Sequence, residues 1–344
     1  NVIIHVINSL LFLKLLMLMF AGYESKFKTY AIFFGALIFA VHPIHTEAVA
    51  WVSGRTDSLS CTFFFAAFIY YLKYSESPNY KNLSLLILFY LLSLLAKEMA
   101  ITLPVVIILY DIIVNRKQDL MKLWKEKSAV YSSLIVFSIL YLVLRWAVLK
   151  DVPERITYNY FYGKDLAVTV LTMLQTIPLY FRLTIIPYGM LYHYSGYLPY
   201  VDSFLNFTVI FPIIFILIML AAAVNMYKRA TVLSYSILFF FITLLPVLNI
   251  VPTMNFMADR FLYIPSVIVS LIFIGVVLKY YSDKNRNIIY GAFGVVLLGY
   301  SYLTIARNAD WKTNDTLLIS ADNRPGTVTY VNIGNMYANK QQYE

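Results

Sequence analysis

The sequence predicts an all-α polytopic membrane protein, a bundle of hydrophobic helices followed by a short polar tail. Hydrophobic residues make up 60% of the 344 positions, and the mean hydropathy is +0.71. Long apolar runs follow one another with only short polar breaks, as is typical of helices that cross or enter a bilayer. The runs cover about 2–20, 30–41, 59–74, 83–96, 99–114, 129–149, 166–186, 204–226, 232–250, 261–281 and 288–306.

Composition excludes several classes of protein. The net charge is +9, but lysines and arginines are spread through short loops, so anionic lipid is the expected partner and nucleic acid is not. The single cysteine, Cys61, allows no disulfide framework and no cysteine-based metal site within the chain. The sequence contains no Walker motif, glycine-rich dinucleotide fingerprint, zincin motif or nucleophile elbow, which excludes a nucleotide-driven cytoplasmic enzyme.

The distribution of Lys and Arg predicts the topology, because cytoplasmic loops are enriched in them. Alternation through all eleven runs puts basic loops on both sides, so one run is expected not to span. The run 166–186 is the candidate, since it contains Gln175, Pro178 and Arg182. Ten spans then remain in residues 1–306. Inside loops carry Lys26, Lys28, Lys73, Lys81, Arg116, Lys117, Lys122, Lys125, Lys127, Lys228, Arg229, Lys279, Lys284 and Arg286, against Arg55, Lys97, Lys150, Arg155, Lys164 and Arg260 outside.

The tail, residues 307–344, is polar and is predicted to lie outside with the 42–58 loop. Its end has the spacing of the first helix of a tetratricopeptide repeat. One such helix cannot bury a core alone, so we expect a repeat array to continue beyond the chain. The first residues are apolar and no initiator Met is present, so we also expect a missing N-terminus. The spacing is formed by Tyr330, Ile333, Gly334, Tyr337, Tyr343 and Glu344.

Residues 42–57 interrupt the apolar background with five ionisable side chains. Pro43 suits a helix start and Gly54 a helix exit, which predicts a helix of about eleven residues, too short to cross a bilayer. Ionisable groups at membrane depth are costly and usually mark a substrate or ion site. The alternative is that His42 and Arg55 extend to lipid headgroups while Glu47 pairs with a nearby cation.

Three further polar patches are expected on the same side of the membrane. Lys97-Glu98 separates two apolar runs, either as a turn or as a contact to a lipid phosphate. Asp259-Arg260 precedes another run, where Arg260 could grip a phosphate with two hydrogen bonds or both residues could cap a helix. The stretch Tyr192-His193-Tyr194-Ser195 suits either a sugar-stacking surface or an interfacial aromatic belt.

Several stretches together resemble the transmembrane and tetratricopeptide-repeat O-mannosyltransferases and their prokaryotic relatives, members of the C-type glycosyltransferase superfamily. The block His42-Pro-Ile-His-Thr-Glu47 is the most specific of them, and all occur in the family's order. The fold is therefore expected to be C-type glycosyltransferase-like. The matching stretches are 41–57, 96–102, 245–249, 259–265, 307–311 and 332–335.

The resemblance implies a polyprenyl-phosphate-linked sugar donor, mannose-like, an active site on the non-cytoplasmic face, and repeats that present a protein acceptor. Family members also carry an acidic motif in the loop after their first helix, usually taken to hold the catalytic base. We expect the chain to begin after that loop and therefore to lack this motif.

Sugar transfer to a hydroxyl needs a base for the acceptor proton and cations for the departing phosphate. We therefore predict catalytic roles for His45, Glu47 and Asp57. Cofactors are not indicated, apart from a divalent metal for which His45 and Glu47 are possible but insufficient ligands. The predicted substrate-binding residues are His42, Arg55, Lys97, Glu98, His193, Asp259 and Arg260.

Two other functions stay open at this point. A transporter or flippase of a lipid-linked sugar would need the same phosphate-binding groups, although the chain shows no inverted repeat and no paired broken helices. A non-catalytic membrane anchor for the repeats would have no use for buried ionisable groups.

Overall fold

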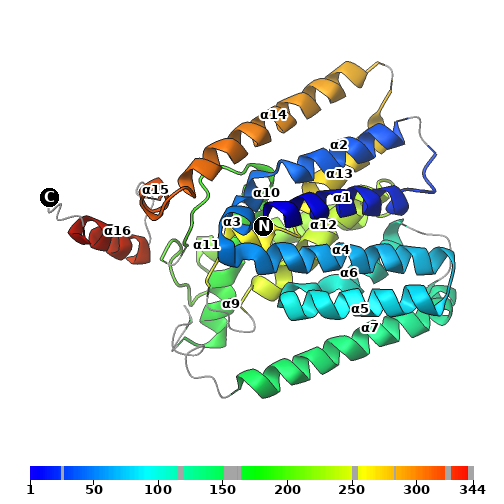
Figure 1. Cartoon of the computed structure of the whole chain (residues 1–344), viewed down its shortest axis with the longest axis horizontal. Coiled ribbons are helices and arrows are strands. Elements are labelled where there is room, and N and C mark those ends of the chain that lie inside the picture. The colour runs from blue at the N-terminus through cyan, green and yellow to red at the C-terminus, as the bar shows by residue number, and fades with distance from the viewer. Residues whose placement is uncertain are drawn as a thin grey trace.

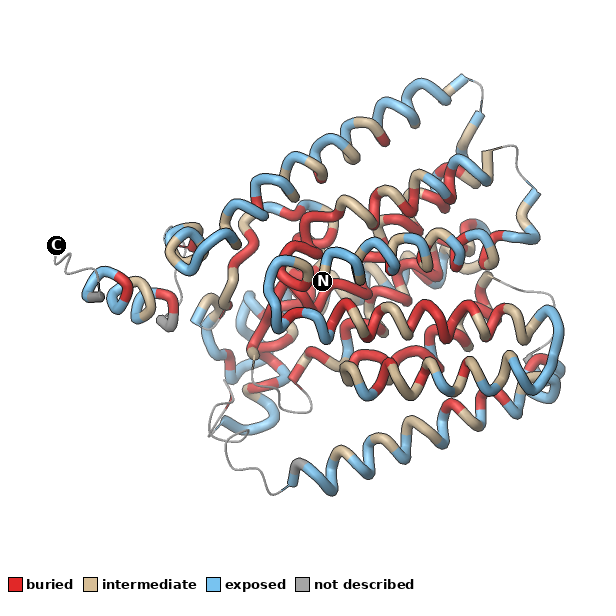
Figure 2. Tube along the Cα trace, viewed as in Figure 1, coloured by how far each residue is buried: buried red, intermediate tan, exposed pale blue. Residues whose placement is uncertain are grey.

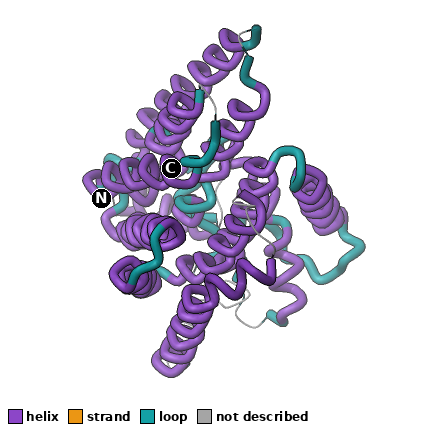
Figure 3. Tube along the Cα trace, turned by 90° about the vertical axis from the view of Figure 1, so that its right-hand side faces the viewer, coloured by secondary structure: helices purple, strands orange, loops and turns teal. Residues whose placement is uncertain are grey.

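A computed structural model of the chain confirms the all-α prediction. It describes residues 1–24, 27–114, 120–150, 161, 164–194, 196–249, 255–282, 284–321 and 327–339, and within these it contains helices and loops but no strand (Figures 1 and 3). The main helices are α1 (Val2–Met19), α2 (Lys28–Ala40), α4 (Arg55–Glu76), α5 (Tyr80–Ala96), α6 (Leu103–Leu109), α7 (Leu120–Leu149), α9 (Leu166–Leu174), α10 (Thr176–Ile185), α11 (Phe207–Met226), α12 (Thr231–Leu244), α13 (Val267–Tyr280) and α14 (Arg286–Asp310).

Short helices connect these rods or follow them. They are η1 (Pro43–His45), α3 (Thr46–Ala50), η2 (Val52–Gly54), η3 (Glu98–Thr102), η4 (Tyr110–Val114, a π-helical turn), η5 (Leu245–Val247), η6 (Asp259–Leu262), α15 (Asn314–Ser320) and α16 (Thr327–Asn339).

The largest hydrophobic core lies around α4, which packs against α1 on one side and α5 on the other (Figure 1). Phe12, Phe39 and Phe65 contact one another there through their rings, and all three are buried. Helices α7 and α14 are exposed along much of their length (Figure 2). Exposed Leu, Ile and Val on such long helices suit contact with lipid rather than water.

The chain is a multi-pass membrane protein. Six helices in the described residues are long and apolar enough to cross a membrane, or seven if α2 and the 42° bend into residues 43–50 form one broken span. Helices α5 and α12 are apolar but shorter, and α4 does not reach the same hydropathy. The predicted number of ten spans therefore stays a prediction.

The loops gather at two ends of the bundle (Figure 1). At one end Tyr23 bonds Thr231 at 3.0 Å, and the turn at 77–79 lies there too. At the other end the segment 41–57 meets Lys97 and Arg260 through Glu47 and Asp57, so the loops that the sequence places outside share one end. We call this the site end.

The run 166–186 forms α9 and α10, which meet at Gln175. It is long and apolar enough to be a span, so its predicted failure to cross the membrane is not decided by composition. Its contacts lie toward the site end: α9 packs on Val209 near the start of α11, and α10 packs on Phe240 near the end of α12. That this element does not cross the membrane stays a prediction.

Residues 43–54 do not form the single helix that was predicted. They form η1, α3 and η2, because Trp51 takes an extended backbone, with ψ 126°, between α3 and η2. Gly54 is not a left-handed exit, since its φ is −68°. It is needed for space: a Cβ there would lie 2.9 Å from both the Cα of Ala48 and the carbonyl oxygen of Glu47.

The tail begins later than predicted, because α14 continues through position 306 to Asp310. Helix α15 starts with a capping box between Thr313 and Thr316. Helix α16 covers the predicted repeat residues from Tyr330 to Tyr337, whereas Tyr343 and Glu344 lie outside the described residues. A helix is confirmed at this position, and its assignment to a tetratricopeptide repeat stays a prediction.

Some residues used in the predictions lie outside the described residues. They are four basic residues of the topology prediction, Lys26, Arg116, Lys117 and Arg155, and Ser195 of the stretch 192–195.

Candidate active site

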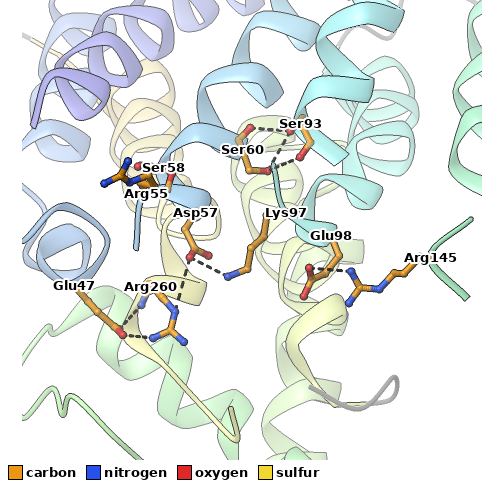
Figure 4. A network of polar contacts seen from close by, with 10 residues as sticks. All are labelled: Glu47, Arg55, Asp57, Ser58, Ser60, Ser93, Lys97, Glu98, Arg145 and Arg260. Atoms are coloured by element: carbon orange, nitrogen blue, oxygen red, sulfur yellow. Dashed lines mark hydrogen bonds and ion pairs between the residues drawn. The ribbon is translucent and has the colours of Figure 1, made fainter. Parts of the chain in front are cut away.

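Glu47 and Arg260 form the centre of a buried ion network at the site end (Figure 4). One Glu47 oxygen, Oε1, accepts from the Arg260 guanidinium, and the other accepts from the Arg260 backbone N–H at 2.8 Å. Their side chains are only 2% and 8% exposed. Both oxygens of Glu47 are therefore committed to holding Arg260 in place.

Asp57 continues the network on the other side of Arg260. Its Oδ2 accepts from Lys97 Nζ at 2.9 Å and lies 3.8 Å from Arg260 Nε. Its Oδ1 is buried and has no hydrogen-bond partner among the described residues. The charges alternate along the series Glu47, Arg260, Asp57 and Lys97 (Figure 4). Within this series, Oδ1 of Asp57 is the carboxylate oxygen that accepts no hydrogen bond from the described residues.

The local backbone favours these charges. Asp57 lies in the first turn of α4, whose N-terminus attracts negative charge, while Lys97 is the C-terminal cap of α5, where a cation is favoured. Ser60 of α4 and Ser93 of α5 donate to each other's backbone carbonyls at 3.1 and 2.7 Å. These bonds fix the two helices in the register that brings Asp57 to Lys97.

Aromatic rings enclose the two cations. The Arg260 guanidinium lies 4.9 Å from the ring centre of Trp51 and 5.1 Å from that of Phe261, and Lys97 Nζ lies 5.3 Å from Phe261. Rings stabilise a cation and keep water away from it, which strengthens its attraction for an anion. Lys97 is the more accessible of the two cations, with 16% of its side chain exposed.

Asp259 forms a second branch next to Arg260. It accepts from the Tyr194 hydroxyl at 2.5 Å, and its Oδ2 lies 3.7 Å from Arg307, which also pairs with Asp310 at 2.9 Å. Burial and the neighbouring Asp259 raise the pKa of Tyr194 well above its usual value, so this hydroxyl stays protonated and donates.

His193 lies in the loop that precedes α11. Its pKa is lowered, mainly by burial and also by the positive charge of Arg260, so the ring stays neutral at pH 7. It can therefore offer a neutral donor or acceptor beside the network but adds no charge to it.

His42 and His45 belong to a different cluster. His42 bonds the carbonyl of Thr184 at 2.9 Å, and His45 bonds the hydroxyl of Ser266 at 2.8 Å. The His45 ring packs 5.1 Å from the ring of His5, at the base of the site. Sequence proximity to Glu47 thus does not join either imidazole to the ion network, and their predicted catalytic and substrate-binding roles stay predictions.

Two other predicted residues also lie outside the network. Arg55 is exposed and its Nε donates to the carbonyl of Val52 at 3.1 Å. Glu98 pairs at 3.3 Å with Arg145 of α7 and does not join the ion network, although its neighbour Lys97 does (Figure 4). Arg55 fits the alternative of a headgroup contact, while Glu98 fits a bond that joins η3 to α7.

No group of three or more His, Cys, Asp or Glu side chains in the described part of the chain is arranged to hold a metal ion. Both Glu47 oxygens already bond Arg260, and His45 Nε2 bonds Ser266. Metal binding by His45 and Glu47 stays a prediction that these contacts do not support.

Sequence reasoning gave no specific role to three residues of the site. Trp51 was not singled out, because a Trp within an apolar stretch resembles any other membrane aromatic. Tyr194 was noted, but not as the partner of Asp259. Arg307 could have been found from Asp310 three residues later, which is the spacing of a helical ion pair.

Comparison with known proteins agrees with the resemblance seen in the sequence. The chain is 25% identical over its whole length to protein O-mannosyl-transferase TMTC3 of Mus musculus, and 26% identical over 93% of its length to protein O-mannosyl-transferase TMTC4 of Homo sapiens. A third relative, TMTC1 of Homo sapiens, is 38% identical over 33% of the chain.

The chain spans 40% of the length of the TMTC3 relative and 49% of the TMTC4 relative. No family model matches the sequence, and no solved structure matches the chain. The chain is thus similar over its length to proteins named as protein O-mannosyl-transferases.

Proposed function

We propose that the protein is a membrane glycosyltransferase that moves mannose from a polyprenyl-phosphate donor to a hydroxyl of a protein acceptor. The names of its relatives support mannosyl transfer to protein. The observation that carries the proposal is the ion network at the site end, in which two cations stand beside an uncommitted carboxylate oxygen. The repeat that begins at α16 would help to present the acceptor.

The chemistry needs a base that takes the acceptor proton and cations that stabilise the departing phosphate. The acceptor oxygen forms a bond to that carbon, the bond from the carbon to the phosphate oxygen breaks, and polyprenyl phosphate leaves with the electron pair. Asp57 Oδ1 takes the acceptor proton, because its other oxygen bonds Lys97. Lys97 and Arg260 stabilise the negative charge that develops on the phosphate. Glu47 keeps Arg260 in position.

The first test is mannosyl transfer by the full-length protein in lipid vesicles, from polyprenyl-phosphate mannose to a serine- and threonine-containing peptide. Lys97→Ala should raise the KM for the donor about 10- to 100-fold, because a charge-assisted contact of about 1.5–3 kcal/mol is lost. Lys97→Arg should recover most of that loss. The matched control is Lys122→Ala, whose side chain is 66% exposed at the opposite end.

A transporter or flippase gives a different result in the same vesicles. Wild-type protein that moves the donor across the membrane but forms no mannosylated peptide would contradict the proposal and favour transport. Protein that does neither would favour a membrane anchor for the repeats.

We also propose that the site end and the tail face the non-cytoplasmic side and that residues 166–186 do not cross the membrane. In sealed cells, a membrane-impermeant thiol reagent should label cysteines introduced at exposed positions Ser53, Lys164, Ser203 and Thr313. Cysteine at Lys122 should stay unlabelled until the cells are opened. Labelling at Lys164 but not at Ser203 would show that 166–186 crosses, and labelling at Lys122 in intact cells would reverse the orientation.

A further inference from the structure

Two buried donors at the end of α14 make no hydrogen bond among the described residues, and the carboxylate oxygen Asp259 Oδ2 stands 3.7 Å from Arg307 Nη2, beyond hydrogen-bond distance. Arg307 Nη2 and Trp311 Nε1 are both inaccessible to solvent and make no hydrogen bond within the described part of the chain. Arg307 as a whole is 7% exposed. A buried donor without an acceptor costs stability, so two of them together indicate a place where a ligand supplies acceptor atoms.

These donors belong to one corner of the site. The Arg307 guanidinium lies 5.9 Å from the ring centre of Trp311 and 3.7 Å from Asp259, which is the neighbour of Arg260. Tyr194 holds the opposite oxygen of Asp259 at 2.5 Å, so that carboxylate is fixed between the loop before α11 and the end of α14. The corner therefore adjoins the cations that we propose for the donor phosphate.

The local charge identifies the kind of ligand. Arg307 faces two carboxyl groups, Asp259 at 3.7 Å and Asp310 at 2.9 Å, so its positive charge is already matched within the chain. A further anion therefore gains little here. A neutral polyol suits this corner, because its hydroxyl oxygens can accept from the two N–H groups while its hydroxyl protons are donated to the carboxyl groups. The flat face of Trp311 suits the apolar face of a sugar ring.

We propose that Arg307, Trp311 and Asp259 form a subsite for the hydroxyls of a hexose. The inference rests on the proposed function for the statement that this hexose is the mannose being transferred. Neither Arg307 nor Trp311 is needed for the phosphate contacts or for the proton transfer proposed above, so the subsite makes a separate contribution to sugar binding.

The test is sugar-dependent thermal stability of the full-length protein in detergent, with methyl α-mannoside as the probe. A ligand that binds the folded state raises the unfolding temperature in a saturable way, which gives an apparent Kd. Trp311→Phe keeps a six-membered aromatic ring but removes the N–H together with the five-membered ring of the indole, and should raise this Kd at least about fivefold, the factor expected for one neutral hydrogen bond. Arg307→Lys keeps the charge and removes the second donor arm, and should raise it by a similar factor.

The matched control is Trp124→Phe, because Trp124 is exposed on α7 near the opposite end of the bundle. It should leave the apparent Kd unchanged. The proposal is overturned if wild-type protein shows no saturable response, if Trp311→Phe and Arg307→Lys respond like wild type, or if inorganic phosphate rather than the mannoside gives the response that depends on these residues.

Failure of this inference differs from failure of the proposed function. Protein that transfers mannose with unchanged KM in Trp311→Phe keeps the function and loses the subsite. Protein that binds mannoside through Trp311 but forms no mannosylated peptide keeps the subsite and loses the transferase assignment.

Discussion

Asp57→Asn in the full-length protein is expected to lower the turnover of mannosyl transfer by about 100-fold or more while changing the KM for the donor little. General-base catalysis by a positioned side chain typically contributes about 10²–10⁴-fold. Asn keeps an oxygen for Lys97 but cannot take the acceptor proton at the position of Oδ1, which is the uncommitted atom of the network. The measurement is steady-state transfer in vesicles at several donor concentrations.

Glu47→Gln is the comparison variant that separates loss of the base from displacement of Arg260. Both Glu47 oxygens bond Arg260, so its loss should disturb the position of Arg260 and raise the KM for the donor together with a fall in turnover. If Asp57→Asn raised KM alone, the assignment of Asp57 as the base would be wrong. If Glu47→Gln alone abolished turnover at unchanged KM, the base would be Glu47.

The positions of the helices could be predicted from the sequence, because membrane segments are recognisable by their apolar composition. Each long apolar run contains at least one helix, and the charged stretch at 42–57 lies at the site end. Interruptions were harder to foresee. Trp51 ends α3 because its backbone is extended, and Gly54 leaves space for the close approach of Ala48. Neither feature could be predicted, because each depends on how the neighbouring turn packs.

The pairing of charges could not be predicted from neighbours along the chain. Lys97 and Glu98 are adjacent, yet an extended backbone at Lys97 sends them to Asp57 and to Arg145 respectively. His45 and Glu47 are two residues apart, yet only Glu47 meets Arg260. Long-range partners decide which ionisable groups can be buried, because each buried charge needs an opposite charge or a hydrogen bond.

A second buried ion pair lies at the opposite end of the bundle. Asp111, in the π-helical turn η4, accepts from Lys127 Nζ at 2.8 Å, and its other oxygen accepts from the hydroxyls of Tyr71 and Tyr131. The Asp111 side chain is fully buried and that of Lys127 is 11% exposed. This cluster joins α4 and α7 through η4, and it shares no residue with the ion network at the site end.

Asp111→Ala is therefore expected to lower the free energy of unfolding by about 3–5 kcal/mol, the usual cost of leaving a buried charge without its partner. Denaturant titration in detergent micelles measures the loss. The double variant Asp111→Leu with Lys127→Met should recover part of it, because both charges are removed together while the hydroxyls of Tyr71 and Tyr131 still lose an acceptor. Protein that remains folded should transfer mannose at the wild-type rate, since the site is at the other end. A loss below about 1 kcal/mol in Asp111→Ala, or a double variant as unstable as the single one, would show that the pair does not hold these helices together.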